Sequence, residues 1–187
     1  MTRYQGKTTL TVRGPETKAT TLDYQLLGAE YLGITFKLGT FMPQLPPANL
    51  RDWGNVDLPE ASRRSFWLHG SAWQFPNYEN VDTFIARLIR EQLLVTDPLV
   101  DEVLRGRSQV LSVRSVQYRF LKATGLTNKI IYQITRARQA YALLAQGSTI
   151  LDTVFEAGYA DQPHLTRSLK RFFGQTPAQI ANQNLPE

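Results

Sequence analysis

The spacing of hydrophobic residues changes once along the chain, from short alternating runs to helical periods. Between Thr8 and Phe41, apolar and polar residues alternate in stretches that glycine and proline interrupt. Alternation over roughly four to eight residues is typical of β-strands. The pattern therefore predicts strands within residues 8–12, 20–27 and 31–38, as part of a sheet. Residues 42–60 are proline-rich and lack a period, which predicts a loop with one short helical turn within 48–53.

From Val81 onward the spacing becomes helical. A stripe at i, i+3, i+4 and i+7 predicts a helix that ends near Leu94, and a second helix is expected between Pro98 and Gly106. Capping residues and glycines then predict helices over 112–123, 128–146, 150–157 and 162–173, with a last one starting at Thr176-Pro177. At about 1.5 Å per residue, the helix over 128–146 would be roughly 27 Å long.

Two of these helices combine an apolar stripe with a polar face. In the first, Arg114, Gln117, Tyr118 and Lys122 share the face opposite Val116 and Phe120. The second carries Arg167, Lys170 and Arg171 opposite Leu165, Leu169, Phe172 and Phe173. Arginine and glutamine match base edges in the major groove, and lysine suits phosphate. A short helix, a glycine turn and such a helix are typical of a helix-turn-helix motif.

The net charge supports a polyanionic partner. Residues 1–97 carry ten Lys and Arg and ten Asp and Glu, hence zero, whereas residues 98–187 carry eleven against six, hence +5. Excess positive charge in one predicted domain favours nucleic acid over membrane. A solvated basic surface with no partner is the alternative.

Several classes of function are not expected. There is no cysteine, and the two histidines, His69 and His164, are far apart, so no disulfide, metal site or cofactor is predicted. Residues 1–97 lack a cluster of catalytic residue types, so we expect no enzyme and no catalytic residue. Since no apolar run suits a signal peptide or a membrane helix, a soluble, cytoplasmic protein is expected.

An aromatic-rich segment allows two interpretations. Tryptophan and phenylalanine side chains in this region could form a pocket for a small-molecule effector, with Trp53, Phe66, Trp67 and Trp73 as the candidate effector-binding residues. The alternative is that these large rings pack in a core near a domain junction.

Two stretches show a resemblance to a known family. SVRSVQYRFLKATGLT and ILDTVFEAGYADQPHLTRSLKRFFGQTPAQI resemble the AraC family of bacterial transcription regulators over about residues 98–182. The resemblance implies two helix-turn-helix units joined by a long helix. In that fold the two recognition helices would enter successive major grooves, about 34 Å apart, on one face of the duplex.

The resemblance also implies roles for individual residues. Positions that match base-contacting residues are Arg114, Gln117, Tyr118, Gln162, Pro163, His164 and Arg167. Positions that match backbone contacts are Lys170, Arg171 and the capping group around Thr149. Tyr118 stands where many relatives have arginine, and Pro163 has no side-chain donor. Only RGRSQVL separates the helix after Pro98 from the first recognition helix, so we expect an abbreviated first unit whose scaffolding helix is a single turn.

The N-terminal part resembles, more weakly, a shortened β-rich sensor domain of the cupin style. The expected fold is α+β: a β-rich sensor or dimerisation domain over 1–78, a connecting helix over 79–96 and an AraC-type DNA-binding domain over 97–187. The expected partners are double-stranded DNA and RNA polymerase, with a small-molecule effector and a homodimer as open questions. Two other functions remain: a small-molecule-binding β domain with a helical dimerisation appendage, and a nonspecific architectural DNA binder.

Overall fold

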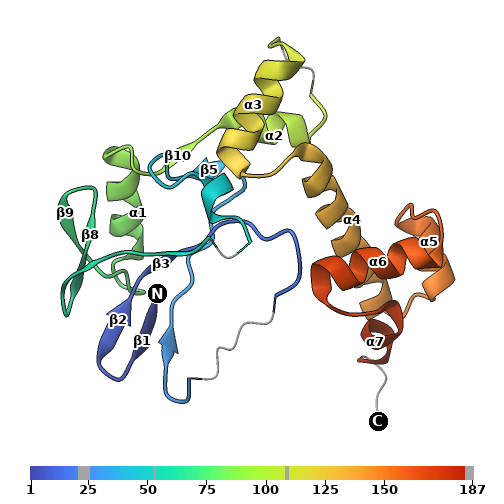
Figure 1. Cartoon of the computed structure of the whole chain (residues 1–187), viewed down its shortest axis with the longest axis horizontal. Coiled ribbons are helices and arrows are strands. Elements are labelled where there is room, and N and C mark those ends of the chain that lie inside the picture. The colour runs from blue at the N-terminus through green and yellow to red at the C-terminus, as the bar shows by residue number, and fades with distance from the viewer. Residues whose placement is uncertain (21–25, 53, 108–109, 184–187) are drawn as a thin grey trace. The chain divides into compact units, whose positions relative to one another are not determined.

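The computed structural model describes residues 1–20, 26–52, 54–107 and 110–183. The N-terminal region holds several small antiparallel sheets, whereas the C-terminal region is helical (Figure 1). The fold is therefore α+β, which confirms the class predicted from the hydrophobic pattern.

The chain divides into two compact units. The first combines Met1–Pro15 with Asp23–Leu126, and the second combines Glu16–Leu22 with Thr127–Glu187. A compact unit is defined by contacts in space, whereas the predicted boundaries at 78 and 96 concern evolutionary domains. Those boundaries therefore stay predictions.

No helix among the described residues is long and apolar enough to cross a membrane.

Short antiparallel sheets make up much of the first unit. Their strand orders are β2-β1-β4 and β7-β8-β9, with β3 paired to β6 and β5 paired to β10. The strands are β1 (Thr2–Tyr4), β2 (Lys7–Thr9), β3 (Thr11–Val12), β4 (Glu30–Tyr31), β5 (Thr40–Phe41), β6 (Val56–Asp57), β7 (Glu60–Ser62), β8 (Ser65–Leu68), β9 (Ser71–Gln74) and β10 (Val95–Thr96).

Two hairpins in this unit have the same turn. Gln5 and Gly6 join β1 to β2 with φ of 48° and 77°, and His69 and Gly70 join β8 to β9 with φ of 48° and 76°. Positive φ at both central residues gives a turn whose twist matches that of the flanking strands. His69 therefore has a structural position at an exposed turn.

The core of the first unit lies between the β8-β9 hairpin and α1 (Val81–Arg90). Phe66 and Trp73 face each other across the hairpin and are almost fully buried, and the Phe84 ring of α1 packs edge-on against both. The other buried members of this cluster are Leu68, Phe75, Leu88, Leu93 and Leu94.

Helix α3 (Val113–Thr124) also belongs to the first unit. It packs against α2 (Pro98–Leu104), against the 3-10 turn η1 (Pro47–Leu50) and against β5. At the end of α3, Gly125 lies so close to η1 that an added Cβ would sit 2.6 Å from the Pro47 carbonyl carbon. The predicted first recognition helix is thus supported by residues far away in the sequence.

The second unit is a small helical bundle. The bounds of its helices are α4 (Asn128–Ala145), α5 (Ile150–Glu156), α6 (Gln162–Phe173) and α7 (Pro177–Asn182). Figure 1 shows the three shorter helices gathered around α4, in agreement with the contacts of α4 with each of them. Thr127, Thr149 and Thr176 cap α4, α5 and α7, as predicted, and each accepts a hydrogen bond from a backbone N–H in the first turn.

Several sequence-based boundaries were wrong. The predicted strand over 31–38 contains only the end of β4, the strand β1 was not predicted, and α1 ends at Arg90 instead of near Leu94. Gln92 has a φ of 57°, which is incompatible with continuing the helix, and the next two residues turn inward as core leucines. Most of the strand predicted over 20–27, and Trp53 of the predicted turn, lie outside the described residues.

Candidate nucleic-acid interface

The second helix-turn-helix is formed by α5, a turn over residues 157–161 and α6. The Thr149 hydroxyl accepts from the Asp152 backbone N–H at 3.1 Å, which fixes the start of α5. The Asp161 carboxylate accepts from the His164 backbone N–H at 2.6 Å and starts α6. An acidic cap also complements the positive end of the helix dipole. These two caps define where each helix begins.

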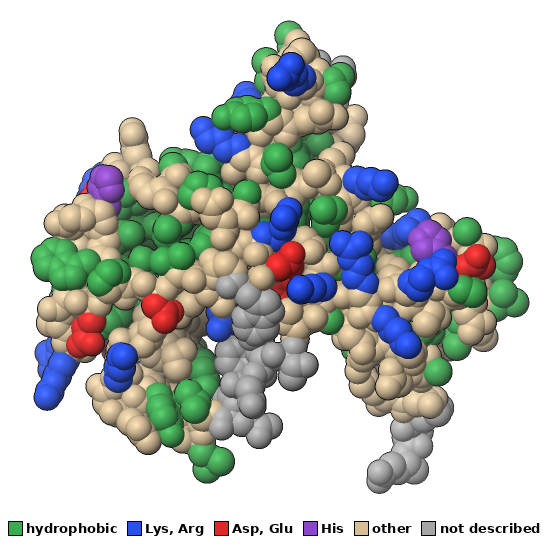
Figure 2. Space-filling view, viewed as in Figure 1, with side chains coloured by type: hydrophobic (Ala, Val, Ile, Leu, Met, Phe, Trp, Pro, Cys, Tyr) green, Lys and Arg blue, Asp and Glu red, His purple; other side chains and the backbone are tan. Residues whose placement is uncertain are grey.

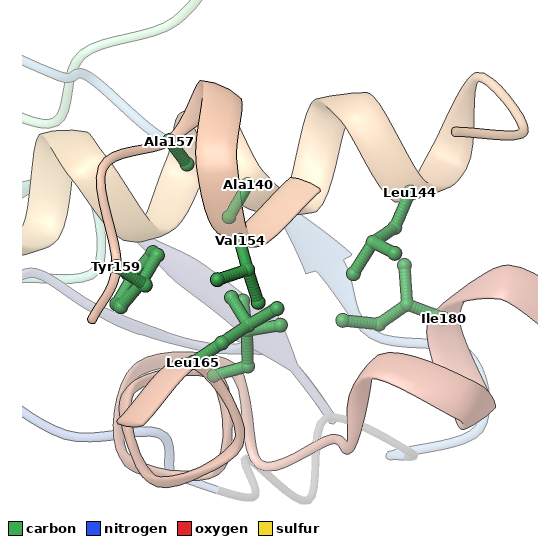
Figure 3. Close-up of a cluster of buried hydrophobic side chains, with 8 residues drawn as sticks. Ala140, Leu144, Val154, Ala157, Tyr159, Leu165 and Ile180 are labelled. Atoms are coloured by element: carbon green, nitrogen blue, oxygen red, sulfur yellow. The ribbon is translucent and has the colours of Figure 1, made fainter. Parts of the chain in front are cut away.

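Buried side chains hold α6 in place. Leu165 and Leu169 have no exposed surface, and they pack with residues from α4, α5 and α7 in one cluster. Figure 3 shows the side chains of this cluster converging between the helices. Its remaining members are Ala140, Leu144, Val154, Ala157, Tyr159 and Ile180. Because the apolar stripe of α6 is fixed inward, its polar face must point outward.

The outward face of α6 carries the residues that the sequence singles out. Gln162, Pro163, Arg167 and Lys170 are exposed, whereas His164 is half-buried. Figure 2 shows Lys and Arg side chains gathered over α4 and α6 on the face in view. Arg167 and Lys170 take part in no ion pair recorded for the described part of the chain. Their charged ends are available to a polyanion.

Arg171 is exposed as well, but its side chain has a protein partner. Its Nε donates to the backbone carbonyl oxygen of Thr17 at 3.2 Å, and its guanidinium lies 5.1 Å from the centre of the Phe172 ring. Thr17 belongs to the short N-terminal segment of the second unit. Arg171 is therefore partly engaged within the protein, unlike Lys170.

A cluster around His164 lies where α6 meets α4. Arg136 of α4 stacks its guanidinium over the Tyr159 ring at 4.3 Å and donates to the Gly158 carbonyl oxygen at 3.3 Å. Its other terminal nitrogen lies 3.3 Å from His164 Nε2. The Tyr159 hydroxyl pairs with Ser168 Oγ at 2.9 Å. One arginine thus contacts both the turn and the start of the recognition helix.

The predicted first recognition helix, α3, is built in a similar way. The Ser112 hydroxyl accepts from the Ser115 backbone N–H at 3.2 Å, and Gly125 ends the helix with a φ of 69°. Phe120 and Ala123 are buried. The predicted polar face is exposed, and it consists of Arg114, Gln117, Tyr118 and Lys122.

An ion pair joins α3 to the start of α2. Arg119 donates to both carboxylate oxygens of Asp97, at 2.6 and 3.0 Å, and the same carboxylate caps α2 by accepting from Leu99 N–H. The hydrogen bond with Asp97 raises the pKa of the Arg119 guanidinium, and the carboxylate charge adds to this effect. At seven residues α2 is about two turns long, so the expected single-turn scaffold is a longer helix.

The four candidate effector-binding residues are not brought together. Phe66 and Trp73 are core residues, with exposed fractions of 0% and 1%, whereas Trp67 is 47% exposed. Successive side chains of a strand point to opposite faces, so Trp67 faces away from its buried neighbours. The guanidinium of Arg87 covers the Trp73 ring at 3.7 Å. Trp53 lies outside the described residues. For Phe66 and Trp73 the arrangement favours the alternative of core packing.

Sequence reasoning missed three residues of the α6 site. Asp161 had a detectable signal, since an aspartate directly before a helix is a common cap. Arg136 and Tyr159 had none, because only the folded bundle brings them together with His164.

No group of three or more metal-ligating side chains occurs within the residues that the structure describes.

Comparison with known proteins identifies the helical region. Residues 109–183 match a family model described as a helix-turn-helix domain, of the AraC type. No curated protein and no solved structure matches the chain. The matched range begins just before α3 and ends one residue after α7, so it covers both candidate recognition helices. The chain therefore carries a C-terminal AraC-type helix-turn-helix domain and is a transcription regulator that binds double-stranded DNA.

Proposed function

We propose that this regulator binds DNA sequence-specifically and that α3 and α6 enter two successive major grooves. The observation that carries the proposal is the shared design of the two helices. Each has twelve residues, a side-chain cap at its start, a buried apolar stripe and an exposed face with arginine and glutamine. Such a helix can place its polar face against base edges without disturbing its own core.

The exposed residues take separate roles in this proposal. Base edges are contacted by one group on each helix, namely Arg114, Gln117 and Tyr118 on α3, and Gln162, Pro163, His164 and Arg167 on α6. Pro163 offers only apolar contact, and Tyr118 offers a hydroxyl where arginine would offer a bidentate pair. Lys122, Lys170, Arg171 and the capped start of α5 at Thr149 contact phosphates. Regulation follows when the bound protein recruits or blocks RNA polymerase.

Selection of bound sequences from a random DNA pool tests two-groove binding. At physiological salt we expect a site with two preferred blocks about ten base pairs apart, the spacing of one helical turn. A single block would mean that only one helix contacts bases. An absence of any preferred block would favour the alternative of a nonspecific architectural binder.

Arg167 provides the sharpest test of base contact. Arg167→Ala should weaken binding to the selected site by about 1–3 kcal/mol if the guanidinium pairs with a guanine, and it should weaken binding to random DNA much less. Lys170→Ala is the matched control, because it removes the same charge from the same helix at a proposed phosphate contact. An equal loss on selected and random DNA for Arg167→Ala would refute the base contact.

A further inference from the structure

His164 of α6 is half-buried, and its Nε2 lies 3.3 Å from a terminal nitrogen of Arg136. We infer that Arg136 holds His164 as the tautomer with its proton on Nδ1, so that this side chain offers a hydrogen-bond donor to the DNA bases. The inference rests on the proposed function, in which α6 contacts base edges. It makes Arg136 a positioning residue that acts through His164.

The chemistry of the two side chains determines the tautomer. A guanidinium has only donors, so His164 Nε2, 3.3 Å from a terminal nitrogen of Arg136, must act as the acceptor. A neutral imidazole with an acceptor at Nε2 carries its proton on Nδ1. No hydrogen bond of Nδ1 is recorded among the described residues. The free donor of His164 is therefore Nδ1–H.

The surroundings keep both partners in place. Tyr159 is buried, and its ring meets the His164 ring edge to face, with centroids 5.1 Å apart and planes at 85°. The guanidinium of Arg136 stacks over the same Tyr159 ring. The hydroxyl of Tyr159 is in turn held by Ser168 on the next turn of α6. The histidine ring thus has few orientations open to it.

Arg136 itself is bound in an unusual way. Its Nε is buried without a hydrogen-bond partner, and none of the ion pairs recorded for the described residues involves it. An unsatisfied buried donor lowers stability and calls for an explanation. Fixing His164 explains why the guanidinium is kept in this position.

The tautomer sets which bases His164 can contact. A lone donor in the major groove can pair with guanine N7 or O6, with adenine N7 or with thymine O4, but not with the amino group that cytosine presents there. The opposite tautomer would offer an acceptor at Nδ1, which would pair with the amino group of cytosine or adenine instead. Arg136 therefore determines a base preference without contacting DNA.

Nitrogen-15 NMR of the free full-length chain tests the tautomer directly. Long-range nitrogen–proton correlations distinguish a proton on Nδ1 from one on Nε2. They should be recorded well above pH ~6.5, the ordinary pKa of histidine, so that the rings are neutral. We expect His164 to carry its proton on Nδ1 and the exposed His69 to show the tautomer mixture of a free imidazole. A His164 signal with the proton on Nε2 would overturn the inference, whether or not any variant folds.

Arg136→Met tests the cause. Methionine keeps an apolar side chain beside Tyr159, whose ring the guanidinium covers, and removes a buried donor that has no partner, so the fold should tolerate it. It also removes the hydrogen bond to the Gly158 carbonyl oxygen. The His164 signal should move to the free-imidazole mixture. Arg138→Met is the matched control, because it removes the same charge from an exposed position on the same helix. A merely structural role for Arg136 would lower the melting temperature and leave the tautomer unchanged, which would overturn the inference.

Base preference supplies the functional measurement. His164→Ala and Arg136→Met should each reduce discrimination at the same single base pair of the selected site, by roughly 3- to 10-fold, the value of one hydrogen bond. Arg138→Met should leave discrimination there unchanged. If the wild-type chain selects a site but His164→Ala alters no base preference, the inference fails together with the base contact proposed for His164, whereas sequence-specific binding through the other residues of α3 and α6 stands. If the wild-type chain selects no sequence at all, the proposed function itself fails.

Discussion

The backbone N–H of Ala19 donates a hydrogen bond to the carbonyl oxygen of Arg171, with a nitrogen-to-oxygen distance of 2.6 Å. The last carbonyls of a helix have no partner within the helix. A segment near the N-terminus supplies one here and also accepts from the Arg171 side chain through Thr17. The C-terminal end of α6 is therefore held by residues more than a hundred and fifty positions earlier, within the same compact unit.

This contact predicts that two neighbouring basic residues differ in their effect on DNA binding. Lys170→Ala should reduce the slope of log affinity against log salt concentration by about 1, as expected for one lost phosphate contact. Arg171→Ala should reduce it less, because Thr17 already binds the guanidinium. Titrations of random and selected DNA at several salt concentrations measure both slopes. Equal reductions would show that Arg171 leaves Thr17 when DNA binds.

Two glycines with the same backbone conformation should respond differently to alanine. Gly125 and Gly158 both have a φ of 69°, but a Cβ on Gly125 would lie 2.6 Å from the Pro47 carbonyl carbon, whereas one on Gly158 would have no neighbour within 4 Å. Gly158→Ala should cost about 1 kcal/mol of unfolding free energy from the left-handed conformation alone. Gly125→Ala should cost more, roughly 2 kcal/mol or above, since backbone must also move.

Thermal and urea unfolding of the full chain, followed by circular dichroism, compare the two variants. Because Gly158→Ala carries the conformational strain without the close contact, it is the control for Gly125→Ala. Equal destabilisation would mean that the end of α3 can move away from η1 at little cost.

The ion pair between α2 and the N-terminal region predicts a pH dependence. The hydrogen bond from Lys37 lowers the pKa of the Asp101 carboxyl below its ordinary value of 3.8, and the charges of Lys37 and Arg105 act in the same direction, against desolvation. A carboxyl whose pKa is lowered by folding stabilises the fold above its unfolded pKa and loses this effect as the pH falls through the folded value.

Asp101→Asn should therefore melt slightly lower than the wild type at neutral pH, and the difference should disappear in acid, below about pH 3.8. The effect should be small because the pair is open to solvent. Glu102→Gln is the matched control, because it changes the neighbouring carboxylate, which takes part in none of the ion pairs recorded for the described residues. A difference that persists in acid would come from a cause other than the ion pair.

The helices of the C-terminal half were predictable because their signals are local. Ser112, Thr127, Thr149 and Thr176 cap helices at the predicted positions, and Gly125 and Gly174 end α3 and α6. A cap requires only a hydroxyl or carboxylate within three residues of a free N–H, so the sequence contains the whole interaction. The exposed polar faces of α3 and α6 followed from the same helical spacing.

The short strands of the N-terminal half and the contacts between distant residues could not be predicted from the sequence. Strands of two or three residues leave too little alternation to detect, which is why β1 was missed and the strand over 31–38 was predicted too long. Arg136 and His164 lie 28 positions apart, and Thr17 and Arg171 lie 154 apart. Only folding brings the members of each pair together, so neither contact could be predicted from spacing.

The packing of α3 against η1 also limits which changes of sequence this protein can accept. The matched helix-turn-helix region starts at residue 109, yet the end of its first recognition helix rests on Pro47–Leu50, which lie in another part of the sequence. A substitution in that turn can therefore move α3 even though no residue of the turn is a proposed DNA contact. An exchange of C-terminal regions between relatives would separate α3 from the surface that it fits. The segment that can be inherited as a module is thus larger than the segment that the family model matches.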